Sequence, residues 1–181
     1  MSPGLARFIL RVFGWRIVGD IPTSLKKYVV IAAPHTSWWD FFVGLLSRSA
    51  IGRRICFLGK KSLFKPPLGW IMRGIGGYPV DRSKNTKLVD QVIDLFRRHD
   101  EFAIALAPEG TRKKVSAFRS GFYYIARGAG VPIICVKLDY GNKTVFFSLP
   151  FYPTQDAEED LNFLWNHFAG AKGKRPGQGI S

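Results

Sequence analysis

Apolar positions recur along the chain in two alternating patterns. Short runs of aliphatic and aromatic residues predict β-strands at 28–33, 55–59, 78–80, 102–107, 132–138 and 143–149. Apolar residues at helical spacing lie between them and predict helices at 38–49, 84–98, 118–128 and 156–169, with a loop or short helix at 66–74. Because strands alternate with helices, the pattern predicts an α/β fold with a mixed or largely parallel sheet flanked by helices.

The N-terminal segment has a helical pattern of its own. Leu5, Phe8 and Val12 share one face of an amphipathic helix predicted within residues 1–18, and Arg7 and Arg11 lie off that face. Such a helix can lie in a membrane interface, with its arginines near phosphate headgroups, or pack on the domain as an ordinary surface helix. The segment alone leaves both interpretations open.

Length and composition describe one globular unit. The chain has 181 residues, of which 46% are hydrophobic, enough apolar material to bury a core. We find no internal repeat and no linker long enough to separate two domains, so residues 1–170 are predicted to form a single domain. The Gly-rich, basic segment 171–181 is predicted to be a disordered tail. Cys56 and Cys135 lie in apolar runs, which predicts buried, inert thiols.

Positive charge is concentrated in the first half of the chain. The formal net charge is +14, and residues 1–89 carry 15 Lys and Arg against three acids, whereas residues 90–181 carry 12 against 10. A field of this kind attracts polyanions such as nucleic acid, an anionic membrane surface or phosphorylated small molecules. Because no apolar run is long enough to cross a bilayer and the N-terminus lacks the features of a secretory signal, we expect a protein on the cytosolic side.

A histidine and an aspartate follow the first predicted core strand. His35 and Asp40 stand where the apolar run gives way to a helix, a position at which α/β proteins expose functional residues. The two can meet if His35 lies in the turn before the helix and Asp40 in its first turn. A carboxylate on one imidazole nitrogen would leave the other free to accept a proton from a hydroxyl. The alternative is a histidine that only caps the helix.

A second candidate functional segment, residues 108–112, follows the most apolar predicted strand. Gly110 lets the backbone approach a ligand closely, while Thr111, Arg112 and free amides can hold phosphate oxygens. Glu109, in so basic a loop, is expected to orient Arg112 or to accept a hydrogen bond from a substrate hydroxyl. A tight turn with a surface ion pair would explain the composition, but not why the turn follows a buried strand.

Two further segments complete a set of four. Gly77 precedes a short predicted strand that ends in Asp81 and Arg82, and Arg82 is a second candidate for binding phosphate. Val131 and Pro132 open another aliphatic run. In this order, the His-x4-Asp, Arg82, Pro-Glu-Gly-Thr-Arg and Val-Pro segments resemble the glycerolipid acyltransferase family, which includes the bacterial 1-acylglycerol-3-phosphate acyltransferases. The resemblance covers about residues 28–138.

The resemblance implies an O-acyltransferase of phospholipid biosynthesis. It would move a fatty acyl group from acyl-CoA or acyl-carrier protein to the free hydroxyl of a lysophospholipid, above all 1-acylglycerol-3-phosphate. His35, oriented by Asp40, would deprotonate that hydroxyl, and the reaction would need neither a metal nor a cofactor. The acceptor site would be formed by Arg82, Glu109, Gly110, Thr111 and Arg112.

Some residues depart from the family pattern or extend it. Pro79 and Val80 replace an aromatic-aliphatic pair, and Ala107 replaces a larger residue, which bears on the acceptor more than on the chemistry. Lys60 belongs to a basic and aromatic stretch that would meet the phosphates of CoA or the lipid surface. We therefore expect a peripheral protein on the cytoplasmic face of an anionic membrane, attached through residues 1–18, aromatic loops and the basic half of the chain.

Two other functions would use some of the same features. A thioester hydrolase would keep the pair of His35 and Asp40 but use water as the acceptor. A basic nucleic-acid-binding module would account for the charge, but the sequence has no aromatic-rich nucleic-acid fingerprint or zinc-ligand spacing, and residues 108–112 would have no role in it. We therefore expect no nucleic-acid partner.

Overall fold

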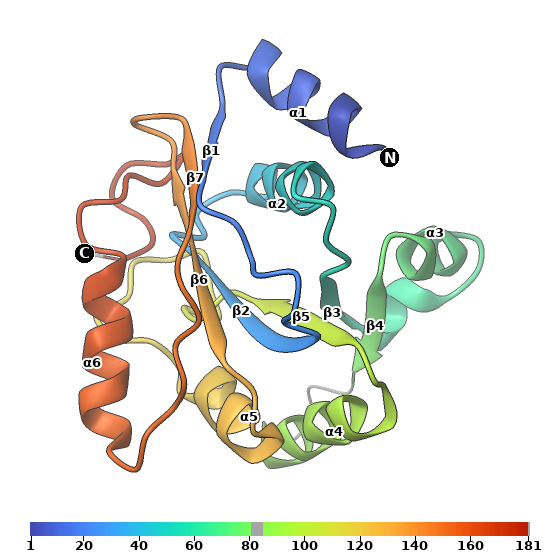
Figure 1. Cartoon of the computed structure of the whole chain (residues 1–181), viewed down its shortest axis with the longest axis vertical. Helices are drawn as coiled ribbons and strands as arrows, with labels where there is room; N and C mark the ends of the chain where they lie inside the picture. The colour runs from blue at the N-terminus through green and yellow to red at the C-terminus, as the bar shows by residue number, and fades with distance from the viewer. Residues whose placement is uncertain (81–84, 181) are drawn as a thin grey trace.

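A central β-sheet organises the structure (Figure 1). The computed structural model describes residues 1–80 and 85–180, with only the backbone for 85–87, and within these residues the sheet has seven strands in the order β1-β7-β6-β2-β5-β3-β4. The strands are β1 (Arg16–Val18), β2 (Lys27–Ala33), β3 (Cys56–Lys60), β4 (Gly77–Val80), β5 (Phe102–Leu106), β6 (Ile133–Asp139) and β7 (Thr144–Phe147). The run from β6 to β4 is parallel, β7 is antiparallel to β6, and β1 is parallel to β7. The predicted mixed, largely parallel sheet is confirmed.

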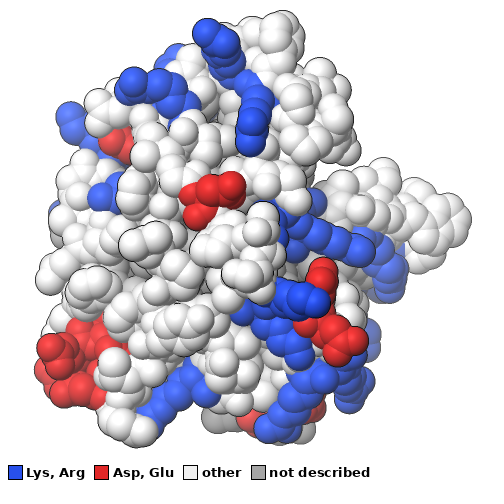
Figure 2. All heavy atoms as spheres, viewed as in Figure 1, with Lys and Arg blue, Asp and Glu red and all other residues white. Residues whose placement is uncertain are grey.

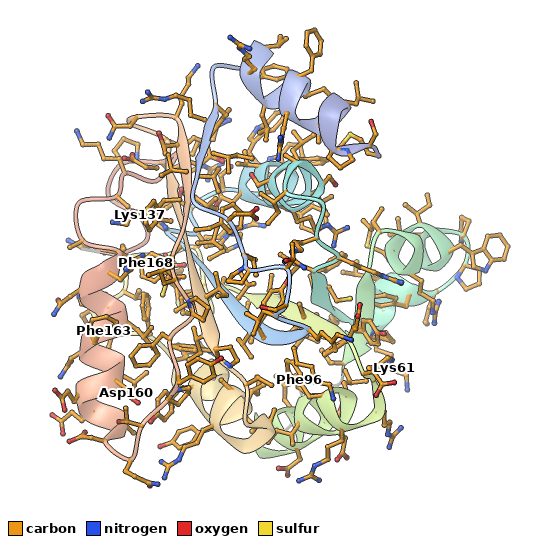
Figure 3. The ribbon with its side chains drawn as sticks, in the orientation of Figure 1. Lys61, Phe96, Lys137, Asp160, Phe163 and Phe168 are labelled. Carbon is orange, nitrogen blue, oxygen red and sulfur yellow. The ribbon has the colours of Figure 1, made fainter. Side chains whose placement is uncertain are left out.

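Helices cover both faces of the sheet, as Figure 1 shows. On one face lie α4 (Asn85–Arg98), α5 (Gly121–Ala129) and α6 (Ala157–His167). On the other face lies α2 (Trp39–Ala50), with α1 (Pro3–Val12) packed upon it. The short 3-10 helix η1 (Lys61–Phe64) and α3 (Leu68–Gly74) follow β3 and project from the side of the molecule. Phe96 of α4 and Phe168, which caps α6, belong to the buried cluster on the first face (Figure 3).

The central strands are buried on both faces, which is why they read as continuous apolar runs. In β2, Val29 and Ile31 face the cluster that includes α4, α5 and α6. Their neighbours Tyr28 and Val30 face the opposite cluster, which includes Val43 of α2. This two-sided burial fixes the register of β2 in the middle of the sheet, because a slip by one residue would exchange the two sets of side chains.

The N-terminal helix is shorter than the sequence predicts. It ends at Val12, and Gly14 takes the left-handed conformation, with φ of +77°, that commonly terminates a helix. Arg16–Val18 then pairs with β7, so residues expected to continue the helix form an edge strand instead. Ala6 and Leu10 pack on α2. The opposite side of α1 remains exposed.

Candidate active site

The loops that carry His35, Glu109 and Tyr140 meet at one edge of the sheet. Strand β2 lies between β5 and β6, with Ile31 opposite Leu106 and Ala33 opposite Lys137. Because these three strands are parallel, the chain segments that follow them all leave at the same edge. The segments starting at residues 34, 107 and 140 are therefore neighbours.

His35 and Asp40 are in contact, in the arrangement that the spacing allows. His35 lies in the turn after β2 and Asp40 in the first turn of α2, with 3.1 Å between His35 Nδ1 and Asp40 Oδ2. The His35 side chain is 26% exposed and that of Asp40 only 2%. With Nδ1 held by the carboxylate, Nε2 is the nitrogen that can face a substrate.

The carboxylate of Asp40 is held by several donors. Its Oδ2 accepts hydrogen bonds from the amides of Thr36 and Ser37, each at 2.8 Å, and its Oδ1 accepts one from the Tyr140 hydroxyl at 2.7 Å. Burial alone would raise the pKa of Asp40, but the hydrogen bonds from His35, Ser37 and Tyr140 lower it below its ordinary value. Asp40 is therefore an ionised, fixed partner that would stabilise a protonated His35.

Tyr140 is a part of this site that sequence reasoning missed. Burial and the hydrogen bond to Asp40 raise its pKa, so the phenol remains a neutral donor. Its ring packs edge-on against Trp15, with 4.8 Å between the ring centroids. Its place directly after a core strand, at the edge where His35 lies, is the signal that could have identified it.

Glu109 contacts the backbone of the histidine loop. Its side chain is buried, and both carboxylate oxygens accept from the backbone amide of His35 at 2.9 Å. Within the described residues no hydrogen bond or ion pair joins Glu109 to Arg112, and a contact with a substrate hydroxyl stays a prediction. Burial raises the pKa of Glu109 to about 7, although the His35 amide acts in the opposite direction. Glu109 therefore anchors the backbone of the histidine loop.

The rest of the loop after β5 is basic and open to solvent. Thr111 accepts a hydrogen bond from the amide of Lys113 at 3.2 Å, and Gly110 is exposed beside it. Arg112, Lys113, Lys114 and Arg119 are exposed, and within the described residues none of them forms an ion pair. These cations are free to meet an anionic ligand next to the histidine.

Lys60 is not brought to the histidine by any described contact, and the position of Arg82 cannot be compared with it. Asp81 and Arg82 lie outside the described residues. Lys60 is exposed at the end of β3, which is separated from β2 by β5. In the described part of the chain, no group of three His, Cys, Asp or Glu side chains could hold a metal ion. Cys56 and Cys135 are buried and free, as predicted.

The C-terminal segment reaches the same edge. Residues 171–181 are predicted to be a disordered tail, but the structure places residues 172–180 against the loops that carry His35 and Glu109. We call residues 172–180 the strap. Prediction from composition misses this placement because the glycines that suggest disorder also permit close backbone packing.

Comparison with known proteins agrees with this geometry. The family model described as Acyltransferase matches residues 16–139, more than half of the chain. The chain is 32% identical over 133 residues to the 1-acyl-sn-glycerol-3-phosphate acyltransferase of Saccharomyces cerevisiae, an alignment that covers 67% of this chain and 41% of that protein. It is 37% identical over 133 residues to the enzyme of the same name from Haemophilus influenzae, covering 69% and 54%. The chain thus spans about half the length of the curated relatives it matches.

A solved structure shares the fold. The crystal structure of the 1-acyl-sn-glycerophosphate (LPA) acyltransferase PlsC from Thermotoga maritima superposes with a TM-score of 0.63 at 21% identity, covering 92% of this chain and 74% of that one. The likeness shows that the α/β architecture is common to both. Because the family model spans the sheet from β1 to β6 and includes both chemical loops, this chain belongs to the acyltransferase family.

Proposed function

We propose that this protein is an O-acyltransferase that moves a fatty acyl group from an acyl thioester to the hydroxyl of a lysophospholipid, with 1-acylglycerol-3-phosphate as the first candidate. The observation that carries the proposal is the contact of His35 with a buried, ionised Asp40 beside a loop of unpaired cations. The names of the related proteins support the acceptor. The donor is acyl-CoA or acyl-carrier protein, and we expect no cofactor.

The proposed reaction is a single acyl transfer. Nε2 of His35 takes the proton of the acceptor hydroxyl while the hydroxyl oxygen attacks the thioester carbonyl carbon. The bond from that carbon to sulfur then breaks, and the departing thiolate takes the proton from the imidazolium. Asp40 stabilises the imidazolium between these steps, and Glu109 holds the backbone on which the ring is mounted. A positioned base of this kind contributes about 10²- to 10⁴-fold to the rate.

We assign recognition of the acceptor phosphate to the loop after β5. Thr111 and Arg112 are exposed or partly exposed there, and a guanidinium can hold phosphate oxygens by two parallel hydrogen bonds. Arg82 remains a candidate second cation from outside the described residues. Gly110, with φ of +64°, lets the side chain of Arg119 lie directly against the backbone of this loop.

We further propose that the protein works at the cytoplasmic face of an anionic membrane. The outer face of α1 exposes large apolar side chains, with Phe8 at 64% and Val12 at 65%. The projecting α3 exposes Trp70 and Ile71, and Figure 2 shows this projection as largely uncharged. Exposed apolar side chains with arginines on the same helix suit a lipid interface.

A basic hollow lies beside α1. It has a volume of about 960 Å³, and its lining includes neither His35 nor Glu109, so we assign it to the membrane surface and not to the reaction. The charged residues of its lining are the cations Arg7, Arg11, Arg16 and Lys137 and the acids Asp20 and Asp139, so the cations outnumber the acids. The charges of the cations favour phosphate headgroups at the depth where α1 would rest. Within the residues described, no helix has the length and apolar character to traverse a bilayer.

Acyl transfer with defined substrates tests the proposed function. Labelled acyl-CoA and acyl-carrier protein are offered to the wild type and to the His35→Ala variant with a panel of lysophospholipids. We expect a diacyl product from the wild type and a loss of at least about 100-fold in His35→Ala. The control is His99→Ala, which removes a histidine that stacks on Phe102 outside the site.

The alternatives give other results. Release of free fatty acid at full rate without any lysophospholipid would identify a hydrolase. Equal activity of His35→Ala and wild type would remove the histidine from the mechanism.

A further inference from the structure

The strap, residues 172–180, is hydrogen-bonded to the segments that follow all three central strands. The amide of Tyr140, after β6, donates to the carbonyl of Lys172 at 2.8 Å. The amide of Arg175 donates to Thr36 Oγ1, after β2, at 3.3 Å. The amide of Val115, after β5, donates to the carbonyl of Gly179 at 2.8 Å, and Val115 and Ile180 form a parallel bridge. The strap therefore connects the histidine loop, the cationic loop and the tyrosine that supports Asp40.

Glycines bring the backbone of the strap directly onto the histidine loop. A side chain at Gly173 would collide with Thr36. A Cβ at Gly179, where φ is +84°, would lie 2.9 Å from Thr36 Cγ2 and 3.3 Å from Glu109 Oε1. Thr36 is fully buried and Glu109 nearly so. The strap thus helps to bury Thr36, the neighbour of His35 in the sequence, and Glu109, which accepts from the His35 amide.

The strap also carries positive charge to this edge. Lys172, Lys174 and Arg175 are exposed, and no described acid forms an ion pair with any of them. The ammonium of Lys174 lies 4.6 Å from the centre of the ring of Trp39, the residue next to Asp40. The backbone of Arg175 is bonded to the residue next to His35. The Lys174 ammonium thus contacts the neighbour of Asp40 in the sequence, and the backbone of Arg175 contacts the neighbour of His35.

We propose that the strap is a wall of the substrate site and that Lys174 and Arg175 bind a phosphate group of a substrate. The phosphate belongs either to the lysophospholipid acceptor or to the phosphopantetheine-containing donor. This inference rests on the proposed acyl transfer and adds residues to its site. The strap lies beyond residue 139, where the match to the family model ends, so the family match assigns it no role.

Kinetics and binding of a double variant test the two cations. Lys174→Ala combined with Arg175→Ala is compared with the wild type and with Arg97→Ala combined with Arg98→Ala. The control pair removes the same charge from the end of α4, just before β5 begins and so at the opposite edge of the sheet. KM is measured for acceptor and donor separately, and calorimetry measures binding of glycerol 3-phosphate and of coenzyme A.

We expect the strap variant to raise KM for one substrate by about tenfold or more, with kcat changed by less than about threefold. Binding of the matching probe should weaken by a similar factor. A change for the acceptor and glycerol 3-phosphate assigns the cations to the acceptor, whereas a change for the donor and coenzyme A assigns them to the donor. Unchanged KM and binding in an active enzyme would overturn the strap proposal alone. Absence of acyl transfer in the wild type, with probe binding still lost in the variant, would overturn the proposed function alone.

A glycine pair tests whether the strap must be docked. Gly179→Ala places a Cβ against Thr36, whereas Gly177→Ala has similar backbone strain, with φ of +76°, but nothing within 4 Å of the added carbon. We expect Gly179→Ala to speed hydrogen exchange at the Val115 amide and to raise the same KM as the double variant, although both cations remain. Equal KM in the two glycine variants, with the Val115 amide exposed only in Gly179→Ala, would contradict a role of the docked strap in binding.

Discussion

Replacement of Glu109 by glutamine should abolish a specific loss of stability with rising pH. The glutamine keeps an acceptor oxygen for the His35 amide but cannot ionise. In the wild type, burial raises the pKa of Glu109 from an ordinary value of 4.5 to about 7. A carboxyl group with a raised pKa in the folded state stabilises the fold below its unfolded pKa, and this contribution is lost as the pH rises through the folded pKa.

The size of the effect follows from the shift. Between pH 4.5 and about 7 the folded protein holds a proton at Glu109 that the unfolded chain has released. The free energy of unfolding then falls by about 1.4 kcal/mol per pH unit, or about 3 kcal/mol over the whole window. Asp40, whose pKa is lowered, contributes in the opposite direction at lower pH and does so equally in both proteins.

Urea unfolding at several pH values from 4.5 to 8 measures this directly. We expect the stability of wild type relative to Glu109→Gln to fall by about 3 kcal/mol across that range. A second variant, Glu109→Ala, also cannot ionise, and it leaves the His35 amide without this acceptor. It should therefore be less stable than Glu109→Gln by about 1 to 3 kcal/mol at every pH, in addition to the cost of the cavity. A constant difference between wild type and Glu109→Gln would refute both the burial of an ionisable Glu109 and its linkage to folding.

Two further predictions concern the support of the site and its attachment to lipid. Tyr140→Phe removes the donor to Asp40 Oδ1, and the loss of this hydrogen bond raises the pKa of Asp40. We therefore expect kcat to fall by about tenfold and the loss of activity on acidification to begin at higher pH. An unchanged pH profile would show that Tyr140 has no positioning role. Phe8→Ser combined with Val12→Ser should weaken cosedimentation with anionic phospholipid vesicles by tenfold or more without lowering Tm. Phe163→Ser, which changes an exposed phenylalanine on α6, is the matched control, and equal loss in both variants would argue against α1 as the lipid contact.

Local sequence patterns were enough to predict most of the framework. The central strands are buried on both faces, so their apolar runs identify them whatever lies on either side. The contact of His35 with Asp40 is also local, because a turn followed by the first turn of a helix brings residues five apart together. The charge of the loop after β5 is equally a property of the sequence itself.

Tertiary structure alone decided how that pair is supported. Glu109 is 74 residues along the chain from His35, whose amide donates a hydrogen bond to it. Tyr140 is 100 residues from Asp40, and Arg175 is 139 residues from Thr36. Periodicity and spacing in the sequence cannot predict such partners, because these residues meet only when the parallel strands place distant loops at the same edge of the sheet. The same reason explains the strap: its composition describes a flexible chain by itself, but its glycines let it pack closely once Thr36 and Glu109 are in place. The N-terminal segment shows the converse, since its helical pattern runs past Val12 but pairing with β7 decides that Arg16–Val18 is a strand.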